Sequence, residues 1–166
     1  ALVSFERALV LSPPGHPTRP EALARFGEAA FHAGRYAEAR DALSEAVTAF
    51  QAAGDVRGTA RAMCTLGRVF GRLADSRWAE MPAQAVALLE PLPPGPELVG
   101  ALIEVASVEA LEGRGEAAVG HTERALTLAE HGDDTRPMRD ESSYGRAGAW
   151  MMLLLLCGAI AWPASA

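Results

Sequence analysis

The chain has 166 residues, of which 49% are hydrophobic and only 6% are aromatic. This alanine-rich composition favours closely packed helices over strands, and the length suits about four helix pairs. The formal net charge of −6 leaves no overall positive field for a nucleic-acid backbone, so DNA or RNA binding is not expected.

The first predicted elements are a short helix and a complete helix pair. Residues 1–12, with Phe5, Ala8 and Leu9, are typical of the second helix of an earlier pair. Residues 20–53 contain two helical stripes, which a glycine turn at Gly34 separates. The two stripes consist of Leu23, Phe26, Gly27, Ala30 and Phe31, and of Tyr36, Ala39, Leu43, Ala46, Val47 and Phe50. Thr18 and Glu21 predict a capping box at the start of the pair.

Two more pairs follow, at residues 60–92 and 98–130. The first repeats the earlier stripe with Met63, Leu66, Gly67 and Phe70, then has a long connection over residues 75–81. Its second helix is predicted from about Pro82 to Leu92, with Ala85, Leu88, Leu89 and Leu92 inward. The last pair begins at Pro96, which suits a first helical turn, and includes Leu102, Val105, Ala106, Ala118, Ala125 and Leu126.

The C-terminal residues do not follow this pattern. Residues 135–146 are predicted to be a linker, and residues 147–166 contain no charge and are apolar on every side. Three interpretations remain open for 147–166: a packed or capping helix, a short membrane anchor, or a segment that belongs to no selected fold and resembles a misplaced signal peptide. Exposed leucine and tryptophan there would favour self-association.

The repeated pairs resemble tetratricopeptide repeats. The resemblance rests on Leu23-x-x-Phe26-Gly27-x-x-Ala30, then on Gly34-Arg35-Tyr36-Ala37-Glu38-Ala39, Leu43 and Ala46. It extends to 60–92 and to 98–130, although Glu109 and Thr122 occupy positions where the family usually has a large apolar residue. The resemblance implies an all-α solenoid of antiparallel helix pairs over residues 1–134, with about three full repeats plus flanking helices.

A narrower resemblance is carried by the segment from Ala85 to Leu98, which is similar to repeat arrays of large bacterial regulators with an ATPase or nucleotide-cyclase module. The sequence begins at Ala1 without a leader, and we expect it to be a segment of such a longer protein. Cys64 and Cys157 have neither disulfide nor metal-ligand spacing, which favours a reducing, cytoplasmic setting.

No motif for chemistry is present. The chain has no phosphate-binding glycine loop, and His16, His32, His121 and His131 lack metal-ligand spacing. The carboxylates fall on polar helix faces, with no sign of a converging catalytic pair. We therefore expect no enzyme activity, no cofactor and no metal, although a site between helices would be the enzymatic alternative.

Binding is the better hypothesis, because a stack of helix pairs curves and lines its inner surface with the first helix of each pair. By the family pattern, the inner positions are Glu28, Phe31, His32, Arg61, Cys64, Arg68, Arg72, Ile103, Ser107 and Leu111. Arg61, Arg68 and Arg72 share one side of a helix and form a basic strip, which suits carboxylates of a peptide. The alternative is that these arginines are solvated or pair with neighbouring glutamates.

The sequence thus predicts a protein-interaction or scaffold module of a larger bacterial regulatory protein. Its partner would be another protein, a peptide, or another domain of the same polypeptide. The alternatives are an intramolecular sensor that controls an attached ATPase or cyclase, and a membrane-tethered adaptor that uses residues 147–166.

Overall fold

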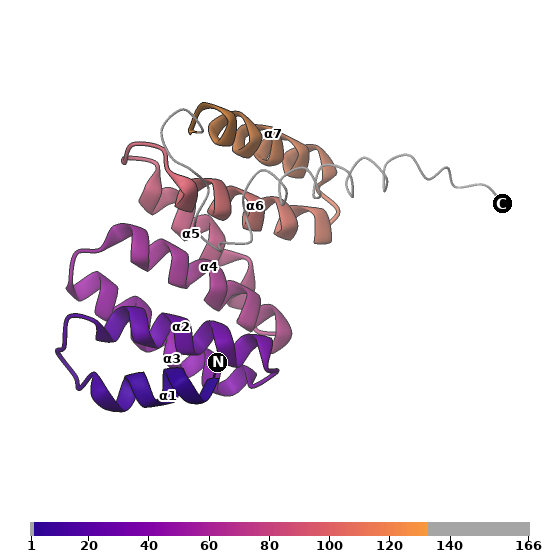
Figure 1. Cartoon of the computed structure of the whole chain (residues 1–166). Coiled ribbons are helices and arrows are strands. Elements are labelled where there is room, and N and C mark those ends of the chain that lie inside the picture. Colours follow the sequence, from indigo (N-terminus) through magenta and orange to yellow (C-terminus); the bar gives the residue numbers. More distant parts are fainter. Residues whose placement is uncertain (1, 133–166) are drawn as a thin grey trace. The chain divides into compact units, whose positions relative to one another are not determined.

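The computed structural model describes residues 2–132. This part of the chain is all α-helical apart from one 3-10 turn (Figure 1). In chain order the elements are α1 (Leu2–Leu11), α2 (Arg19–His32), α3 (Tyr36–Ala52), α4 (Val56–Arg72), η1 (Ser76–Trp78), α5 (Glu80–Leu89), α6 (Pro96–Leu111) and α7 (Gly115–Gly132). The predicted all-α class with consecutive antiparallel helix pairs is confirmed.

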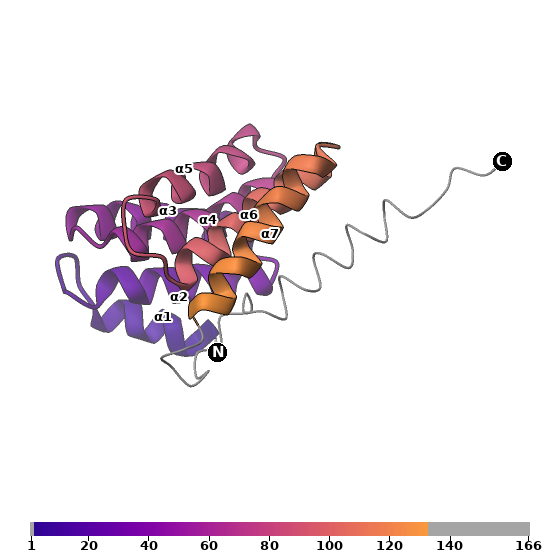
Figure 2. The same cartoon turned by 90° about the horizontal axis from the view of Figure 1, so that it is seen from above.

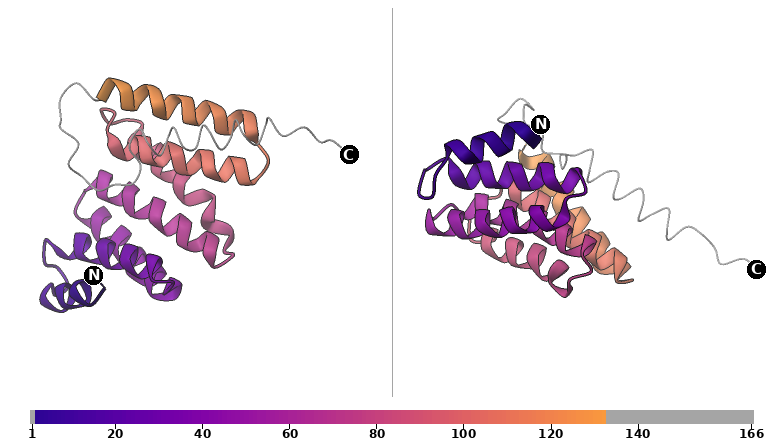
Figure 3. Two further views of the ribbon diagram at one scale, coloured as in Figure 1. Left: turned by 45° about the vertical axis from the view of Figure 1, so that its right-hand side comes forward. Right: turned by 90° about the horizontal axis from the view of Figure 1, so that it is seen from below.

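The chain divides into two compact units, one from Ala1 to Leu89 and one beginning at Glu90. In the first unit α2 pairs with α3 and α4 pairs with α5, while α1 packs on α2. Figures 1 and 2 show α2 and α4 next to each other in one layer, with α3 in a second layer. The described part of the second unit is the α6–α7 hairpin, which is clear in the left view of Figure 3.

Four helix ends share one backbone motif. Gly34 has φ +75°, and its N–H donates to the carbonyl of Phe31 while Arg35 N–H donates to Ala30 O. This is the Schellman motif, which satisfies carbonyls that a helix end would leave without donors. The same pair of bonds recurs at three other positive-φ residues, namely Gly54, Ala74 and Gly113.

The helical stripes of the first unit form two connected apolar clusters. One contains Leu23, Ala24, Phe26, Ala42, Ala46, Phe50 and Ala62, with Phe5 and Leu9 of α1 packed against it. The other contains Ala30, Ala39, Leu43, Leu66, Val69 and Phe70. Small residues allow close approach: a Cβ on Gly27 would lie 2.6 Å from Leu43 Cγ. The predicted stripes of 20–53 are therefore confirmed, with Phe31, Tyr36 and Val47 half-buried at the edge.

The long connection before α5 contains η1. Asp75 precedes it and accepts hydrogen bonds at Oδ1 from the N–H and Nε of Arg77. The Arg77 guanidinium also lies over the Phe70 ring, 4.1 Å from its centroid. These contacts hold residues 75–77 of the connection against the end of α4.

Three sequence expectations were wrong in detail. The helix α4 begins at Val56 rather than near residue 60, because Asp55 caps it by accepting from Gly58 N–H. The helix α5 ends at Leu89 rather than Leu92, since Pro91 has no N–H to continue it, and Leu88 is 38% exposed instead of buried.

The third expectation that was wrong is the capping box predicted at the start of α2. Thr18 is the N-cap of α2 but makes no side-chain cap bond. Its hydroxyl instead lies 2.8 Å from His16 Nδ1, and the Glu21 carboxylate is engaged by two arginines.

The second unit accommodates its two unusual residues by hydrogen bonding. Thr122 is fully buried, and its hydroxyl donates to Ala118 O one turn earlier. The Glu109 carboxylate is 2.8 Å from His121 Nδ1, and this contact links α6 to α7. Ala106 and Ala118 form the small apolar contact between the two helices.

The predicted linker 135–146 and apolar segment 147–166 lie outside the described residues. Within residues 2–132, no helix is long and apolar enough to cross a membrane.

Candidate partner-binding face

The neighbouring helices α2 and α4 present a common set of side chains, which we call the α2/α4 face. It consists of Glu21, Arg25, Glu28, Phe31 and His32 from α2, and Arg61, Cys64, Arg68 and Arg72 from α4. None of these side chains is among the fully buried core residues. On each helix these residues lie on the same side, because residues three, four or seven apart share one side of a helix.

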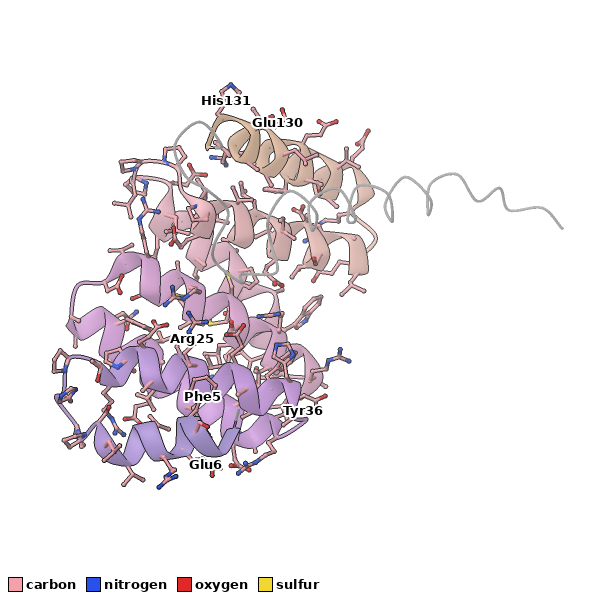
Figure 4. All side chains as sticks on the ribbon, in the orientation of Figure 1. Phe5, Glu6, Arg25, Tyr36, Glu130 and His131 are labelled. Atoms are coloured by element: carbon pink, nitrogen blue, oxygen red, sulfur yellow. The ribbon has the colours of Figure 1, made fainter. Side chains whose placement is uncertain are left out.

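In the N-terminal half of the face, opposite charges pair with one another. Glu21 accepts from Arg25 Nε at 2.9 Å and from Arg61 at 2.5 Å, so one carboxylate links a helical turn of α2 to α4. Arg25 also lies 4.0 Å from Glu28. Arg25 is labelled in Figure 4. These groups are about half exposed, so each pair contributes only about 0–1 kcal/mol.

The C-terminal half of the face is aromatic and basic. The Phe31 ring packs edge-on to His32, with centroids 5.5 Å apart, and lies 5.9 Å from the Tyr36 ring at the start of α3. The Arg68 guanidinium lies 5.4 Å from the Phe31 centroid and donates to Thr65 Oγ1. Phe31 and Tyr36 also pack against the core cluster around Leu43, so this aromatic group is anchored.

The remaining residues of α4 differ in accessibility. Arg72 is exposed and makes no hydrogen bond or ion pair with any residue in the range 2–132. Cys64 is half-buried. The basic strip predicted from Arg61, Arg68 and Arg72 is thus divided: Arg61 is held by a glutamate, Arg68 covers an aromatic ring, and Arg72 extends into solvent.

Next to this half of the face, Arg35 ties α1 to α3. It donates to Glu6 Oε1 at 3.0 Å and to both oxygens of Glu38, and these carboxylates raise the pKa of its guanidinium. Glu6 and Tyr36 are both labelled in Figure 4. Arg35 is therefore already occupied by two carboxylates.

The three candidate residues of the second unit do not behave alike. Ile103 is only 4% exposed and cannot contribute to an open surface, because it packs as a core residue of α6. Ser107 is half-buried and donates to the carbonyl of Ile103. Leu111 is 79% exposed at the end of α6.

Sequence reasoning missed Glu21 and Arg25 as members of the face. A signal for Glu21 was present, because it precedes Arg61 by 40 residues, the same offset that relates Leu23 to Met63. Equivalent positions of adjacent repeats are neighbours in such a stack, so this register predicts the contact. Arg25 follows Glu21 by four residues, the spacing of a helical ion pair.

Other chemistry is not suggested by the described region. Within residues 2–132 no group of three or more His, Cys, Asp or Glu side chains is placed to hold a metal ion.

The described chain is built from antiparallel helix pairs with tight glycine turns, which is a helical-repeat architecture. The first helices of the pairs expose charged side chains, and such a surface is suited to binding. Residues 19–87, which run from the start of α2 into α5, match the tetratricopeptide repeat family, whose repeats generally mediate protein–protein interactions. No curated protein matches the chain at a significant level.

Proposed function

We propose that the chain is a protein-interaction module and that the α2/α4 face is where a partner protein or peptide binds. The observation that carries the proposal is the combination, on two adjacent helices of the matched repeats, of exposed charged residues with an anchored aromatic group. Glu28, Phe31, His32 and Arg72 offer hydrogen-bonding, aromatic and charged contacts within one face.

The mechanism is recognition by a preformed shape. Because the side chains stand on helices whose own cores are packed, little conformational entropy is lost when a partner binds. Anchored aromatic residues and arginines are the side-chain types that dominate binding energy at protein interfaces.

The finer proposal is that this module belongs to a larger cytoplasmic regulatory protein of a bacterium. The partner is then either a separate protein or another domain of the same polypeptide, such as an ATPase or cyclase module that the repeats restrain. The similarity of residues 85–98 to the arrays of such regulators supports this proposal. Tethering to a membrane through residues 147–166 is the remaining alternative, and liposome partitioning that depends on those residues would support it.

The test is affinity capture from a bacterial lysate with the full chain as bait. The bait is compared with a His32→Ala/Arg72→Ala variant, which removes two exposed side chains of the face, and with Arg40→Ala as a matched control. Arg40 lies on α3, in the other layer, and its ion pair is with its neighbour Asp41.

We expect a defined partner that is captured by the unchanged chain and by the control but lost with the double variant, while all three proteins melt at similar temperatures. Equal capture by all three would remove the α2/α4 face as the binding surface.

A further inference from the structure

The sequence Pro-Pro-Gly occurs twice in the chain, each time in a connection that leads into the first helix of a pair. The first copy, Pro13–Gly15, lies between α1 and α2, and the second copy, Pro93–Gly95, lies between α5 and α6. The proline ring fixes its own φ near −65° and disfavours helical backbone in the residue before it. The same triplet nevertheless has two different conformations in this structure.

The first copy is folded into a tight turn. Gly15 has φ +86°, and the N–H of His16 donates to the carbonyl of Pro13 at 3.0 Å. A proline followed by a glycine with positive φ is typical of a type II β-turn. The Arg19 side chain donates to the carbonyl of Ser12 at 2.7 Å, which ties the turn to the start of α2. The backbone of this copy therefore reverses direction.

The second copy is extended. It belongs to neither a helix nor a turn, and Gly95 has φ −151° and ψ 176°. Leu92, Pro93 and Gly95 are each followed by a proline, a context that favours β or polyproline II backbone. The residues Pro93, Pro94 and Pro96 are all exposed. Leu92–Pro96, which we call the proline segment, is thus an extended strand that presents proline rings to solvent.

The ends of the neighbouring helices explain only two of the prolines in this region. Pro91 has no N–H with which to continue α5, and Pro96 is the first residue of α6, where a missing N–H costs no helical hydrogen bond. Pro93 and Pro94 lie between these two positions and are needed neither to end one helix nor to begin the next. They either stiffen the connection or serve recognition.

Both ends of the proline segment are held in place. Before it, the carboxylate of Glu90 accepts two hydrogen bonds from Arg124 of α7, at 2.7 and 3.0 Å. At its other end, the carbonyl of Gly95 accepts from the N–H groups of Leu98 and Val99 at 3.1 and 3.3 Å. All of these residues belong to the second unit. A partner would therefore meet an ordered strand, and little conformational entropy would be lost on binding.

We propose that the proline segment is the ligand of a domain with an aromatic-lined groove for polyproline II peptides. Domains of the SH3, WW and EVH1 classes have such grooves and recognise two prolines three positions apart, the spacing of Pro93 and Pro96. The stiff, extended backbone of such a ligand is formed before binding. This site lies in the second unit and does not depend on the α2/α4 face, which lies in the first.

The experiment probes the labelled full chain against an array of purified SH3, WW and EVH1 domains. Two double variants are compared with the unchanged chain: Pro93→Ala/Pro94→Ala in the proline segment, and Pro13→Ala/Pro14→Ala in the turn. Each variant replaces the two exposed prolines of one Pro-Pro-Gly triplet, so the two differ in the conformation of the triplet that they alter. The affinity of each domain that binds is then measured for all three proteins, together with their melting temperatures.

We expect at least one domain to bind the unchanged chain and Pro13→Ala/Pro14→Ala with the same affinity. Pro93→Ala/Pro94→Ala should bind that domain at least about tenfold more weakly, because it loses both the spacing of the prolines and the stiffness of the strand. The melting temperatures of the two double variants should be similar. His32→Ala/Arg72→Ala should bind the domain normally, which separates this site from the proposed function.

Three results would overturn the inference. The first is that no domain on the array binds the unchanged chain, and the second is an equal loss of affinity in the two double variants. The third is unchanged binding by Pro93→Ala/Pro94→Ala together with a lower melting temperature, which would assign these prolines to stiffening the connection. Each of these results leaves the α2/α4 face as the candidate site for the proposed function.

Discussion

Gly27 determines how closely α2 and α3 approach. A Cβ at this position would lie 2.6 Å from Leu43 Cγ, and Leu43 is only 1% exposed and cannot move aside without disturbing the core. Gly120 in α7 is the opposite case, because an added Cβ there meets nothing within 4 Å. Two helical glycines in one chain thus have different physical roles.

We predict opposite effects for the same substitution at these two positions. Gly27→Ala should destabilise the chain by about 1–3 kcal/mol through overpacking, whereas Gly120→Ala should stabilise it by about 1 kcal/mol through helix propensity. Urea unfolding followed by circular dichroism measures both. A neutral Gly27→Ala would mean that the two helices are not packed as closely as the structure has them.

Ala74 carries a conformational cost that its three counterparts avoid. It has φ +53°, in the left-handed region where a Cβ is unfavourable, while the other Schellman ends of the described region have glycine. We expect Ala74→Gly to stabilise the chain by about 0.5–1 kcal/mol, because relief of strain exceeds the entropy that glycine loses on folding. Thermal melting checks this, and Ala33→Gly, at a helix end with ordinary φ, should instead lower the melting temperature.

At the scale of the elements, helical periodicity and glycine turns were enough to predict the hairpins. Leu23, Phe26 and Gly34 are local signals, since their meaning depends only on residues within a few turns. The 3-10 turn η1 was not predicted, because it depends on how Asp75 and Arg77 pack against the end of α4. The end of α5 at Leu89 was missed although Pro91 is a local signal for it. The ion pair between Glu21 and Arg61 joins two adjacent repeats. Predicting it requires knowing how the two repeats are aligned, and the sequence of one repeat does not give that alignment.

The η1 connection gives a prediction for pH dependence. Hydrogen bonds from the Arg77 side chain and N–H lower the pKa of Asp75 from 3.8 to about 2. A carboxyl whose pKa is lower in the folded state stabilises the protein above its unfolded pKa, and this contribution is lost as the pH falls through the folded pKa. The stabilisation should therefore be present above about pH 4 and disappear toward about pH 2.

The measurement compares the melting temperatures of the unchanged chain and Asp75→Asn across this pH range. The unchanged chain should melt higher at neutral pH, and the difference should shrink as the pH is lowered below about 4. A difference that stays constant with pH would show that the Asp75 carboxylate does not carry this contribution.

At the scale of the whole molecule, the first unit contains most of what the fold and the face require. Both apolar clusters around Phe26 and Leu43 lie within residues 1–89, as does the segment that matches the tetratricopeptide repeat family. The α6–α7 hairpin is a single helix pair, with a small apolar cluster at Ala106 and Ala118. Repeat proteins gain stability from neighbouring units, so the larger unit should be the more autonomous.

We predict that a fragment of residues 1–89 folds by itself. It should retain helical circular dichroism and melt cooperatively, whereas a fragment of residues 90–132 should be largely unfolded, because a single helix pair buries too little apolar surface. A non-cooperative melt of the longer fragment would contradict this division of the chain.

The candidate site was only partly predictable from sequence. Family spacing placed His32 and Arg72 on the accessible side of α2 and α4, but it also placed Ile103 there, which is buried. Spacing gives the side of a helix, whereas burial depends on what packs against that side. The difference between Arg61 and Arg72 likewise depends on a glutamate 40 residues away from Arg61.

The central claim is that the α2/α4 face receives the partner, and NMR chemical-shift mapping tests it most directly. The isotope-labelled full chain is titrated with a peptide selected against it, and the amide shifts are assigned to helices. The account predicts that the largest changes fall on α2 and α4, concentrated around Phe31, His32 and Arg72. Changes confined to α3, in the other layer, would contradict it.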